Sequence, residues 1–228
     1  MKKAFNLAEV LITLGIIGVV SAMTLPSVIT KYQKQSTVAR LKKIYSVMYN
    51  AVNMSIADNG DMNTWDFPES SYYDTGFIPF FRKYYMPYLN IVEECVDSNC
   101  FMKENYKPTS YSGTDESGCA YAGYFVKLSD GTYLYFLSNI RAGYIWMFAD
   151  INGKKKPNII GKDIFVFDIY KYNEGGYKVK FWNINANINH LAGSQSYGCN
   201  KETTQFQGFN CGALIQKSGW EIPDNYPW

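Results

Sequence analysis

An uncharged run of 21 residues, from Val10 to Thr30, stands near the beginning of this sequence. As a helix with a rise of 1.5 Å per residue, such a run is about 30 Å long, which matches the hydrocarbon core of a bilayer. Lys2 and Lys3 precede the run, and Lys31 and Lys34 follow it. This arrangement favours one membrane span whose amino end lies in the cytoplasm.

The helical pattern continues beyond the apolar run, although Pro26 interrupts it. A proline inside a helix removes one backbone hydrogen bond and bends the axis without necessarily ending the helix. Further on, apolar residues recur every three or four positions with Lys and Arg between them: Val38, Leu41, Tyr45, Met48, Val52 and Ile56. The residues Asn59-Gly60-Asp61 favour a turn, which ends the helical pattern. We therefore expect one helix with an apolar half, residues 5–30, and an amphipathic half, residues 31–58.

Beyond this helix, period-two alternation replaces the helical pattern. Strand-like runs cover residues 121–127, 132–137, 144–149, 164–170 and 177–184. Ser129-Asp130-Gly131 and Gly175-Gly176 supply turns between neighbouring strands. Residues 60–118 are aromatic-rich and irregular, apart from a short helix expected at 77–88, and the tail from residue 190 is polar and glycine-rich. We therefore predict an α+β fold, in which the long N-terminal helix packs on an antiparallel sheet within a globular region, residues 59–228.

The residues just before the apolar run carry a further motif. Lys2-Lys3-Ala4 is followed by Phe5, and Glu9 comes four residues after Phe5 at the head of the apolar helix. This pattern resembles the processing site of type IV prepilins, and the similarity extends through Pro26 and the amphipathic half-helix. The resemblance implies that a prepilin peptidase removes the leader, residues 1–4, and that Phe5 is then methylated. The family usually has glycine where this sequence has Ala4.

Type IV pilins and the pseudopilins of type II secretion are structural subunits, so the resemblance implies a filament subunit. It assigns Phe5, Glu9 and Pro26 to assembly. The implied partners are other pilin or pseudopilin subunits, the inner-membrane assembly machinery and the membrane itself. The implied location is the bacterial inner membrane, with the N-terminus in the cytoplasm and the globular region outside it, and later the pilus or pseudopilus.

Glu9 also has a physical reason to take part in assembly. A carboxylate in a membrane helix costs about 2.5–3.5 kcal/mol at the bilayer centre. Cleavage after Ala4 leaves a free amine on Phe5, whose ordinary pKa of about 7.7–8.0 keeps it largely cationic at neutral pH. This amine can meet Glu9 of its own chain or of a neighbour, and at 4 Å the attraction is roughly 4 kcal/mol at an effective dielectric of about 20. The cost of an unpaired carboxylate in lipid and the attraction between the two charges together favour packed helices over single helices.

An ordinary secretory signal peptide is the alternative interpretation of the same segment. Val20-Ser21-Ala22 fits the small-residue rule of signal peptidase, and cleavage there would release a secreted binding protein or enzyme that begins at Met23. The acidic residue at the head of the run, and a run longer than the usual 7–15 or so residues, favour the prepilin interpretation.

All five cysteines lie beyond the apolar run, on the side of the membrane where disulfides form. Cys199 and Cys211 enclose a short loop whose closure would stabilise the fold by about 3 kcal/mol in the chain-entropy model. Cys95 and Cys100 form a second candidate loop, which leaves Cys119 over, although Cys119 can replace either partner. A C-terminal disulfide loop also resembles the surface-exposed variable region of many pilins.

Asp150, Asn152 and Asp163 lie in a segment that resembles a loop and strand of pseudopilin-like domains. Their side chains offer the oxygen ligands that calcium prefers. However, their spacing is not that of an EF-hand, and three consecutive lysines, 154–156, oppose a cation. A plain turn, in which Asp and Asn cap backbone groups, is the alternative, and we expect neither tight calcium binding nor any other cofactor.

Several function classes find no support in the sequence. A formal charge of +2 is too small to indicate a nucleic-acid partner. His190 is the single histidine, and no nucleophile motif, phosphate-binding glycine loop or paired catalytic carboxylate accompanies it. The 20 tyrosines fit a β-rich fold with amphipathic surface side chains, while the spacing does not support a glycan or nucleic-acid stacking surface. We predict that the chain is not an enzyme.

Overall fold

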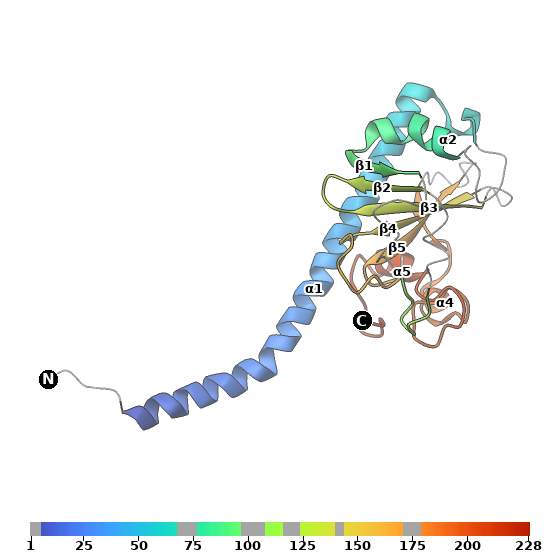
Figure 1. Ribbon diagram of the computed structural model, residues 1–228. Coiled ribbons are helices and arrows are strands. Elements are labelled where there is room, and N and C mark those ends of the chain that lie inside the picture. The colour runs from blue at the N-terminus through green and yellow to red at the C-terminus, as the bar shows by residue number, and fades with distance from the viewer. Residues whose placement is uncertain (1–5, 68–76, 97–107, 116–123, 140–143, 171–178) are drawn as a thin grey trace. The chain divides into compact units, whose positions relative to one another are not determined.

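Figure 1 presents a computed structural model of the protein, which describes residues 6–67, 77–96, 108–115, 124–139, 144–170 and 179–228. The chain divides into two compact units, residues 1–37 and residues 38–228. Helix α1, Leu7–Asn59, belongs to both: its first residues form the first unit and its remaining residues enter the second.

Helix α1 is unbroken over 53 residues and passes through Pro26, as the sequence predicts. It ends at Asn59, where Gly60 adopts a positive φ of 78° and its N–H donates to the Ile56 carbonyl at 2.9 Å. Glycine occupies that left-handed conformation without a steric cost, which is why the turn signal ends the helix here.

The part of α1 in the second unit buries one face in the main hydrophobic core. The buried residues are Leu41, Ile44, Met48, Ala51, Val52 and Ser55. Of the six apolar residues predicted to line the buried face, Leu41, Met48 and Val52 are buried. The other three, Val38, Tyr45 and Ile56, are half-buried at the margin of that face. Ile44, Ala51 and Ser55 are buried in place of Val38, Tyr45 and Ile56, so the buried face is rotated slightly from the predicted one.

The sheet contains six antiparallel strands in the order β1-β2-β3-β4-β5-β6, which is also their order along the chain. Its strands are β1 Ile91–Cys95, β2 Tyr124–Leu128, β3 Tyr133–Asn139, β4 Tyr144–Asp150, β5 Ile164–Tyr170 and β6 Lys180–Phe181. Figure 1 shows β1 to β5 following one another in this order. A long helix on an antiparallel sheet is the predicted α+β arrangement, and that prediction is confirmed.

Both faces of the sheet are buried, which is unusual for an antiparallel sheet. One face, with Val126, Leu134 and Phe167, belongs to the core that α1 enters. The opposite face, with Tyr135 and Phe148, forms a second core under the loops. The sequences of strands β2 to β5 are accordingly mostly apolar instead of strictly alternating.

Short helices flank the two ends of the sheet. Helix α2, Phe77–Tyr84, and the 3₁₀ turn η2, Met86–Tyr88, together occupy the helix predicted at 77–88, and η1, Met62–Thr64, precedes them. Helix α4, Ile188–Gly193, and helix α5, Cys211–Lys217, lie in the C-terminal region, and α5 contacts β5. Figure 1 places α2 near β1 and α5 near β5.

Three local predictions differ from the structure. Residues 60–118 include a strand, β1, whose Val92 is 61% exposed and whose Glu93 and Glu94 are charged, so that no apolar alternation marks it. Within the described part of the predicted strand 177–184, residues 179–184, pairing with β5 is limited to Lys180–Phe181, and Asn183 then adopts a positive φ of 57° and turns the chain. The polar tail contains helix α5, in which Cys211 to Ile215 are buried.

Candidate assembly helix and associated sites

The N-terminus of α1 is capped by two side chains. Asn6 Oδ1 accepts from the Ala8 backbone N–H at 3.3 Å, and Glu9 Oε2 accepts from the Asn6 backbone N–H at 3.1 Å. This reciprocal pair is a capping box, which satisfies backbone donors that have no partner within the helix. Ala4 and Phe5 lie outside the described residues, and their processing stays a prediction.

Sequence reasoning missed Asn6, although a signal for it was present. An Asn followed three residues later by Glu, directly before an apolar run, is a known sequence pattern of a helix N-terminus. Glu9 therefore has a local structural partner in the single chain, in addition to the role in assembly that the resemblance implies.

The apolar half of α1 is exposed along its whole length. Every Leu, Ile, Val and Met side chain from Leu7 to Ile29 is between 39 and 76% exposed. Within the described residues, α1 is the one helix that is long and apolar enough to cross a membrane. A signal sequence near an N-terminus meets the same criterion, so length and composition alone do not separate the two interpretations.

Hydroxyl groups in this apolar half donate hydrogen bonds to backbone carbonyls of the helix, so they need no water molecule as a partner. Thr24 Oγ1 donates to the Val20 carbonyl and Thr30 Oγ1 to the Pro26 carbonyl, both at 2.9 Å. Similar bonds join Thr13 to Val10 and Ser27 to Thr24. Polar groups satisfied in this way can enter a hydrocarbon environment at little cost.

Basic side chains of α1 bind the globular region in the second unit. Lys43 Nζ lies 2.7 Å from Asp130 Oδ2 in the turn between β2 and β3. Arg40 Nη1 donates to the Ile151 carbonyl at 3.2 Å, just beyond β4. Lys42 Nζ lies 5.6 Å from the centre of the Trp220 ring. These contacts add polar attachments beside the buried face of the helix.

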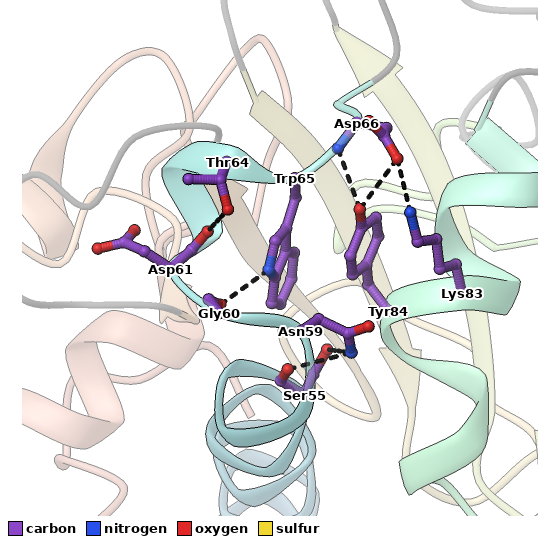
Figure 2. A network of polar contacts seen from close by, with 9 residues as sticks. All are labelled: Ser55, Asn59, Gly60, Asp61, Thr64, Trp65, Asp66, Lys83 and Tyr84. Atoms are coloured by element: carbon purple, nitrogen blue, oxygen red, sulfur yellow. Dashed lines mark hydrogen bonds and ion pairs between the residues drawn. The ribbon is translucent and has the colours of Figure 1, made fainter.

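The C-terminal end of α1 is held by a polar network, drawn in Figure 2. Asn59 Nδ2 donates to the Ser55 carbonyl at 3.1 Å and to Ser55 Oγ at 3.3 Å. The Trp65 indole N–H donates to the Gly60 carbonyl at 3.0 Å. Figure 2 shows both contacts at the end of the helix, where the Ser55 carbonyl in its last turns and the Gly60 carbonyl directly after it each receive a side-chain donor.

The same network continues to Asp66 on its other side (Figure 2). Lys83 Nζ lies 2.7 Å from Asp66 Oδ2, and the Tyr84 hydroxyl donates to that oxygen at 3.1 Å. The hydrogen bond from Lys83, followed by that from Tyr84, holds the pKa of Asp66 below its ordinary value. The Trp65 and Tyr84 rings stack at 4.4 Å, so α2 is joined to the segment after α1 by charge and by ring contact.

The predicted Cys199–Cys211 disulfide is present, with a Cα–Cα distance of 4.9 Å. Both cysteines are buried, and a Cβ on Gly161 would lie only 2.6 Å from Cys211 Sγ, so this position excludes any side chain. Cys95 is also disulfide-bonded. Cys100 and Cys119 lie outside the described residues, and the Cys95–Cys100 pairing stays a prediction.

The oxygen-rich side chains of the loop after β4 bond to the protein itself. Asp163 accepts from the backbone N–H groups of Asn158 at 2.8 Å and Ile159 at 2.6 Å, and from Asn152 Nδ2 at 3.2 Å. Asp150 Oδ1 accepts from the Asn152 N–H at 3.1 Å. Burial raises the pKa of Asp163, while these N–H donors act in the opposite direction. The geometry is that of a capped turn, and the expectation of no tight calcium binding stays a prediction.

The described residues contain no cluster of three or more His, Cys, Asp or Glu side chains that could hold a metal ion. His190 lies in α4, where its backbone N–H donates to Asn187 Oδ1 at 2.8 Å as part of the helix cap. That the chain is not an enzyme stays a prediction.

The chain matches the profile of a family of unknown function, DUF6613, over residues 27–228. The matched span begins within the apolar half of α1 and includes the whole of the second unit. No curated protein and no solved structure matches the chain.

Proposed function

This chain belongs to DUF6613, a family of unknown function, and we propose that it is a pilin or pseudopilin, a structural subunit that assembles through its N-terminal helix. The filament would be a type IV pilus or the pseudopilus of type II secretion. Before assembly the subunit would reside in the bacterial inner membrane, with its globular region outside the cytoplasm.

The exposed apolar half of α1 carries this proposal. Soluble monomeric proteins rarely expose so much contiguous apolar surface, so Leu7 to Ile29 require either lipid or other protein as surroundings. A filament subunit meets both at different times: lipid before assembly, and the helices of neighbouring subunits afterwards. The helix continues without a break to Asn59, so the assembly segment and the globular region share one element.

Glu9 supports packing among helices rather than a solitary span. It is the single charged residue between Asn6 and Thr30. In hydrocarbon a carboxylate costs about 2.5–3.5 kcal/mol at the bilayer centre, and an opposite charge from a neighbouring subunit offsets that cost. Removal of residues 1–4 creates such a charge, the amine of Phe5.

The cysteines support a location outside the cytoplasm for the second unit. Cys199 and Cys211 are bonded to each other, and Cys95 is bonded as well. Disulfides persist in oxidising compartments and are rare in the cytosol. Because all five cysteines follow the apolar run, one membrane span with a cytoplasmic N-terminus accounts for the bonded state of Cys95, Cys199 and Cys211.

The N-terminus of the mature protein tests the proposal directly. The full chain would be expressed in a Gram-negative host with and without a prepilin peptidase, and its membrane fraction examined by intact-mass and N-terminal peptide analysis. We expect a chain that begins at N-methylated Phe5 when the peptidase is present. Ala4→Gly should be processed at least as well, because the resembling family carries glycine there, whereas Ala4→Leu should be cut less.

A chain that begins at Met23 would instead support cleavage by signal peptidase and the release of a secreted binding protein or enzyme. A chain that keeps residues 1–4 although the peptidase processes a known prepilin in the same cells would overturn the proposal.

A further inference from the structure

Cations dominate the part of α1 that follows the apolar run. Between Glu9 and Asp58 the sequence contains no acidic residue. The basic residues of the same stretch all follow the apolar run, and they are Lys31, Lys34, Arg40, Lys42 and Lys43. The chain therefore carries a net positive charge directly after the segment that is apolar enough to cross a membrane.

The last three of these cations lie on the surface of the second unit. Arg40, Lys42 and Lys43 are exposed, whereas Leu41 and Ile44 beside them are buried in the core. The second unit begins at residue 38, and the apolar run ends at residue 30. The chain itself therefore keeps these cations close to the surface of any membrane that the apolar run crosses.

A second basic segment lies beside Arg40. The Arg40 guanidinium donates to the Ile151 carbonyl, so the connection between β4 and β5 is held against α1 at this point (Figure 1). That connection contains three consecutive lysines, 154–156, and all three are exposed. We name the six residues Arg40, Lys42, Lys43, Lys154, Lys155 and Lys156 the basic patch. Arg40 and Ile151 are 111 residues apart in the sequence, so the fold alone brings the two segments together.

The acidic residues of the same loop are inside the protein. Asp150 and Asp163 are buried. Asp150 accepts from the Asn152 backbone N–H, and Asp163 accepts from the backbone N–H groups of Asn158 and Ile159. The charges that the loop exposes to solvent are therefore those of its lysines.

Other acidic residues near the patch are fewer than its cations. Asp130 forms an ion pair with the patch at 2.7 Å. The Trp220 ring, whose centre lies 5.6 Å from Lys42 Nζ, is followed by the exposed Glu221, and Asp224 is exposed further along the C-terminal segment. Even with all three acids counted against it, the patch of six cations keeps an excess of positive charge. Tryptophan beside a cation is also typical of the boundary between hydrocarbon and water.

We propose that the basic patch binds the anionic lipid headgroups of the bilayer that α1 crosses. A Lys or Arg side chain beside an anionic membrane surface is attracted by about 1 kcal/mol, and the attraction falls off within a Debye length. The position of the patch selects this occupant, because an inserted α1 keeps it within reach of headgroups at all times. Docking holds the second unit against the membrane before assembly. The inference rests on the membrane residence that the proposed function includes.

Docking would be measured on the full chain, at one copy per nanodisc, in phosphatidylcholine discs with and without phosphatidylglycerol. The rate at which an uncharged reagent acetylates each lysine, followed by mass spectrometry, reports how accessible that lysine is. We expect phosphatidylglycerol to slow the acetylation of Lys42 and Lys156 severalfold at low salt. High salt should remove the effect, because it screens exposed charges. Lys83 should react equally in both discs, since it pairs with Asp66 beyond the opposite end of α1.

Lys155→Gln should shift the docking equilibrium about fivefold towards release, which corresponds to the loss of one cation at the membrane surface. The shift is read from the acetylation of Lys42 and Lys156 in discs with phosphatidylglycerol. Lys155→Arg should keep the protection, because the charge is kept. Lys83→Gln is the matched control, since it removes one exposed lysine charge from the far end of the same unit and should leave both rates unchanged.

Equal acetylation of Lys42 and Lys156 in the two kinds of disc would overturn the proposal. So would equal slowing of Lys83, equal effects of Lys155→Gln and Lys83→Gln, or slowing by inorganic phosphate in discs of phosphatidylcholine alone. Protection that requires a second copy of the chain in the disc would identify that copy as the occupant and would also overturn it.

The failure of this inference is distinguishable from the failure of the proposed function. A chain that inserts in the discs but leaves these lysines unprotected contradicts the inference alone, because neither the insertion of α1 nor the mass of the mature N-terminus depends on docking. A chain that does not co-purify with the discs contradicts both.

Discussion

Glu9 has two partners available at the scale of a single residue. In the single chain its carboxylate accepts from the Asn6 backbone N–H at 3.1 Å and so completes the capping box. In a filament it can also neutralise the amine of a neighbouring subunit, as proposed above. Capping needs only an acceptor oxygen, whereas pairing across subunits needs a negative charge, so substitutions can separate the two roles.

Glu9→Gln and Glu9→Ala should both impair filament assembly while membrane insertion stays intact. Glutamine keeps an acceptor for Asn6 but removes the charge, and alanine removes both. Asn6→Ala is the matched control, because it removes the other half of the cap and keeps the charge. Insertion would be measured by membrane fractionation, and assembly by shearing or crosslinking of filaments. Normal assembly of Glu9→Gln beside defective Asn6→Ala would show that capping, not charge, is what assembly requires.

A second residue-scale prediction concerns Glu94 on β1. Its Oε1 accepts from Arg82 Nε and from the Tyr124 hydroxyl, each at 2.7 Å. Burial alone would raise the pKa of Glu94, but these two hydrogen bonds outweigh burial and lower the pKa below its ordinary value of 4.5. A lowered pKa in the folded state contributes stability above the unfolded pKa, and that stability is lost as pH falls through the folded pKa.

Glu94→Gln should therefore lower the free energy of unfolding by about 1 kcal/mol near neutral pH. The difference from the wild type should close as the pH falls below 4.5 and through the lowered folded-state pKa of Glu94, where the wild-type carboxyl becomes protonated. Thermal unfolding of the second unit, followed by near-ultraviolet circular dichroism at several pH values, measures this. Glu93→Gln is the control on the same strand, because the Glu93 carboxylate lies 3.7 Å from Lys127 Nζ and should contribute less. If the difference in the free energy of unfolding between the wild type and Glu94→Gln did not change with pH, the lowered pKa of Glu94 would not be its cause.

At the scale of elements, α1 combines an exposed apolar half with a half that is part of a packed core. Residues from Leu41 to Ser55 bury one face of the helix in the core it shares with the sheet. Lys43 and Arg40 add polar contacts to the loops at the ends of β2 and β4. The globular region should therefore depend on this half of α1 for its own stability.

Two methionines on the same helix test that dependence. Met48 is fully buried, whereas Met54 is 55% exposed. Met48→Ala should lower the free energy of unfolding by about 2–5 kcal/mol, because it leaves a cavity in the core. Met54→Ala should change it by less than about 0.5 kcal/mol. Chemical denaturation of both variants, monitored by tryptophan fluorescence, gives the comparison, and similar losses for the two would show that burial is not the cause.

At the scale of the whole molecule, the C-terminal region contributes residues to both cores of the sheet and is closed by a disulfide. Cys211 begins α5, and Cys199 lies in the segment that precedes it. The Cys199 backbone N–H also donates to the Leu191 carbonyl at 2.9 Å, which ties the bond to α4. The Tyr226 hydroxyl donates to the Gly161 carbonyl, so the final residues are also attached to the loop before β5.

Replacement of both Cys199 and Cys211 by serine should lower stability by about 3 kcal/mol, the value for closing a loop of this length. The melting temperature of the variant would be compared with that of the wild type under non-reducing conditions. Reductant should bring the wild type to the variant's melting temperature or below it, because Cys95 is disulfide-bonded as well. A variant that melts with the wild type would show that the bond does not stabilise the fold.

The sequence alone determined the elements whose signals are local. The unbroken helix through Pro26, its end at Asn59, four of the strands and the Cys199–Cys211 bond all follow from patterns within a few residues or from cysteine spacing. The capping box of Asn6 and Glu9 belongs to this class too, since its signal spans only three residues. Local patterns suffice here because hydrogen bonding and backbone conformation in helices and turns involve near neighbours.

Only the tertiary structure decided which surfaces are covered. Strand β1 forms because β2 offers hydrogen-bond partners to its edge, although its own sequence is charged. The second face of the sheet is buried by loops distant in the chain, where Trp146 of β4 contacts the rings of Phe206 and Phe209 across about sixty residues of sequence. Burial depends on the sum of contacts between distant segments, and no periodicity within one segment records which partner will cover it.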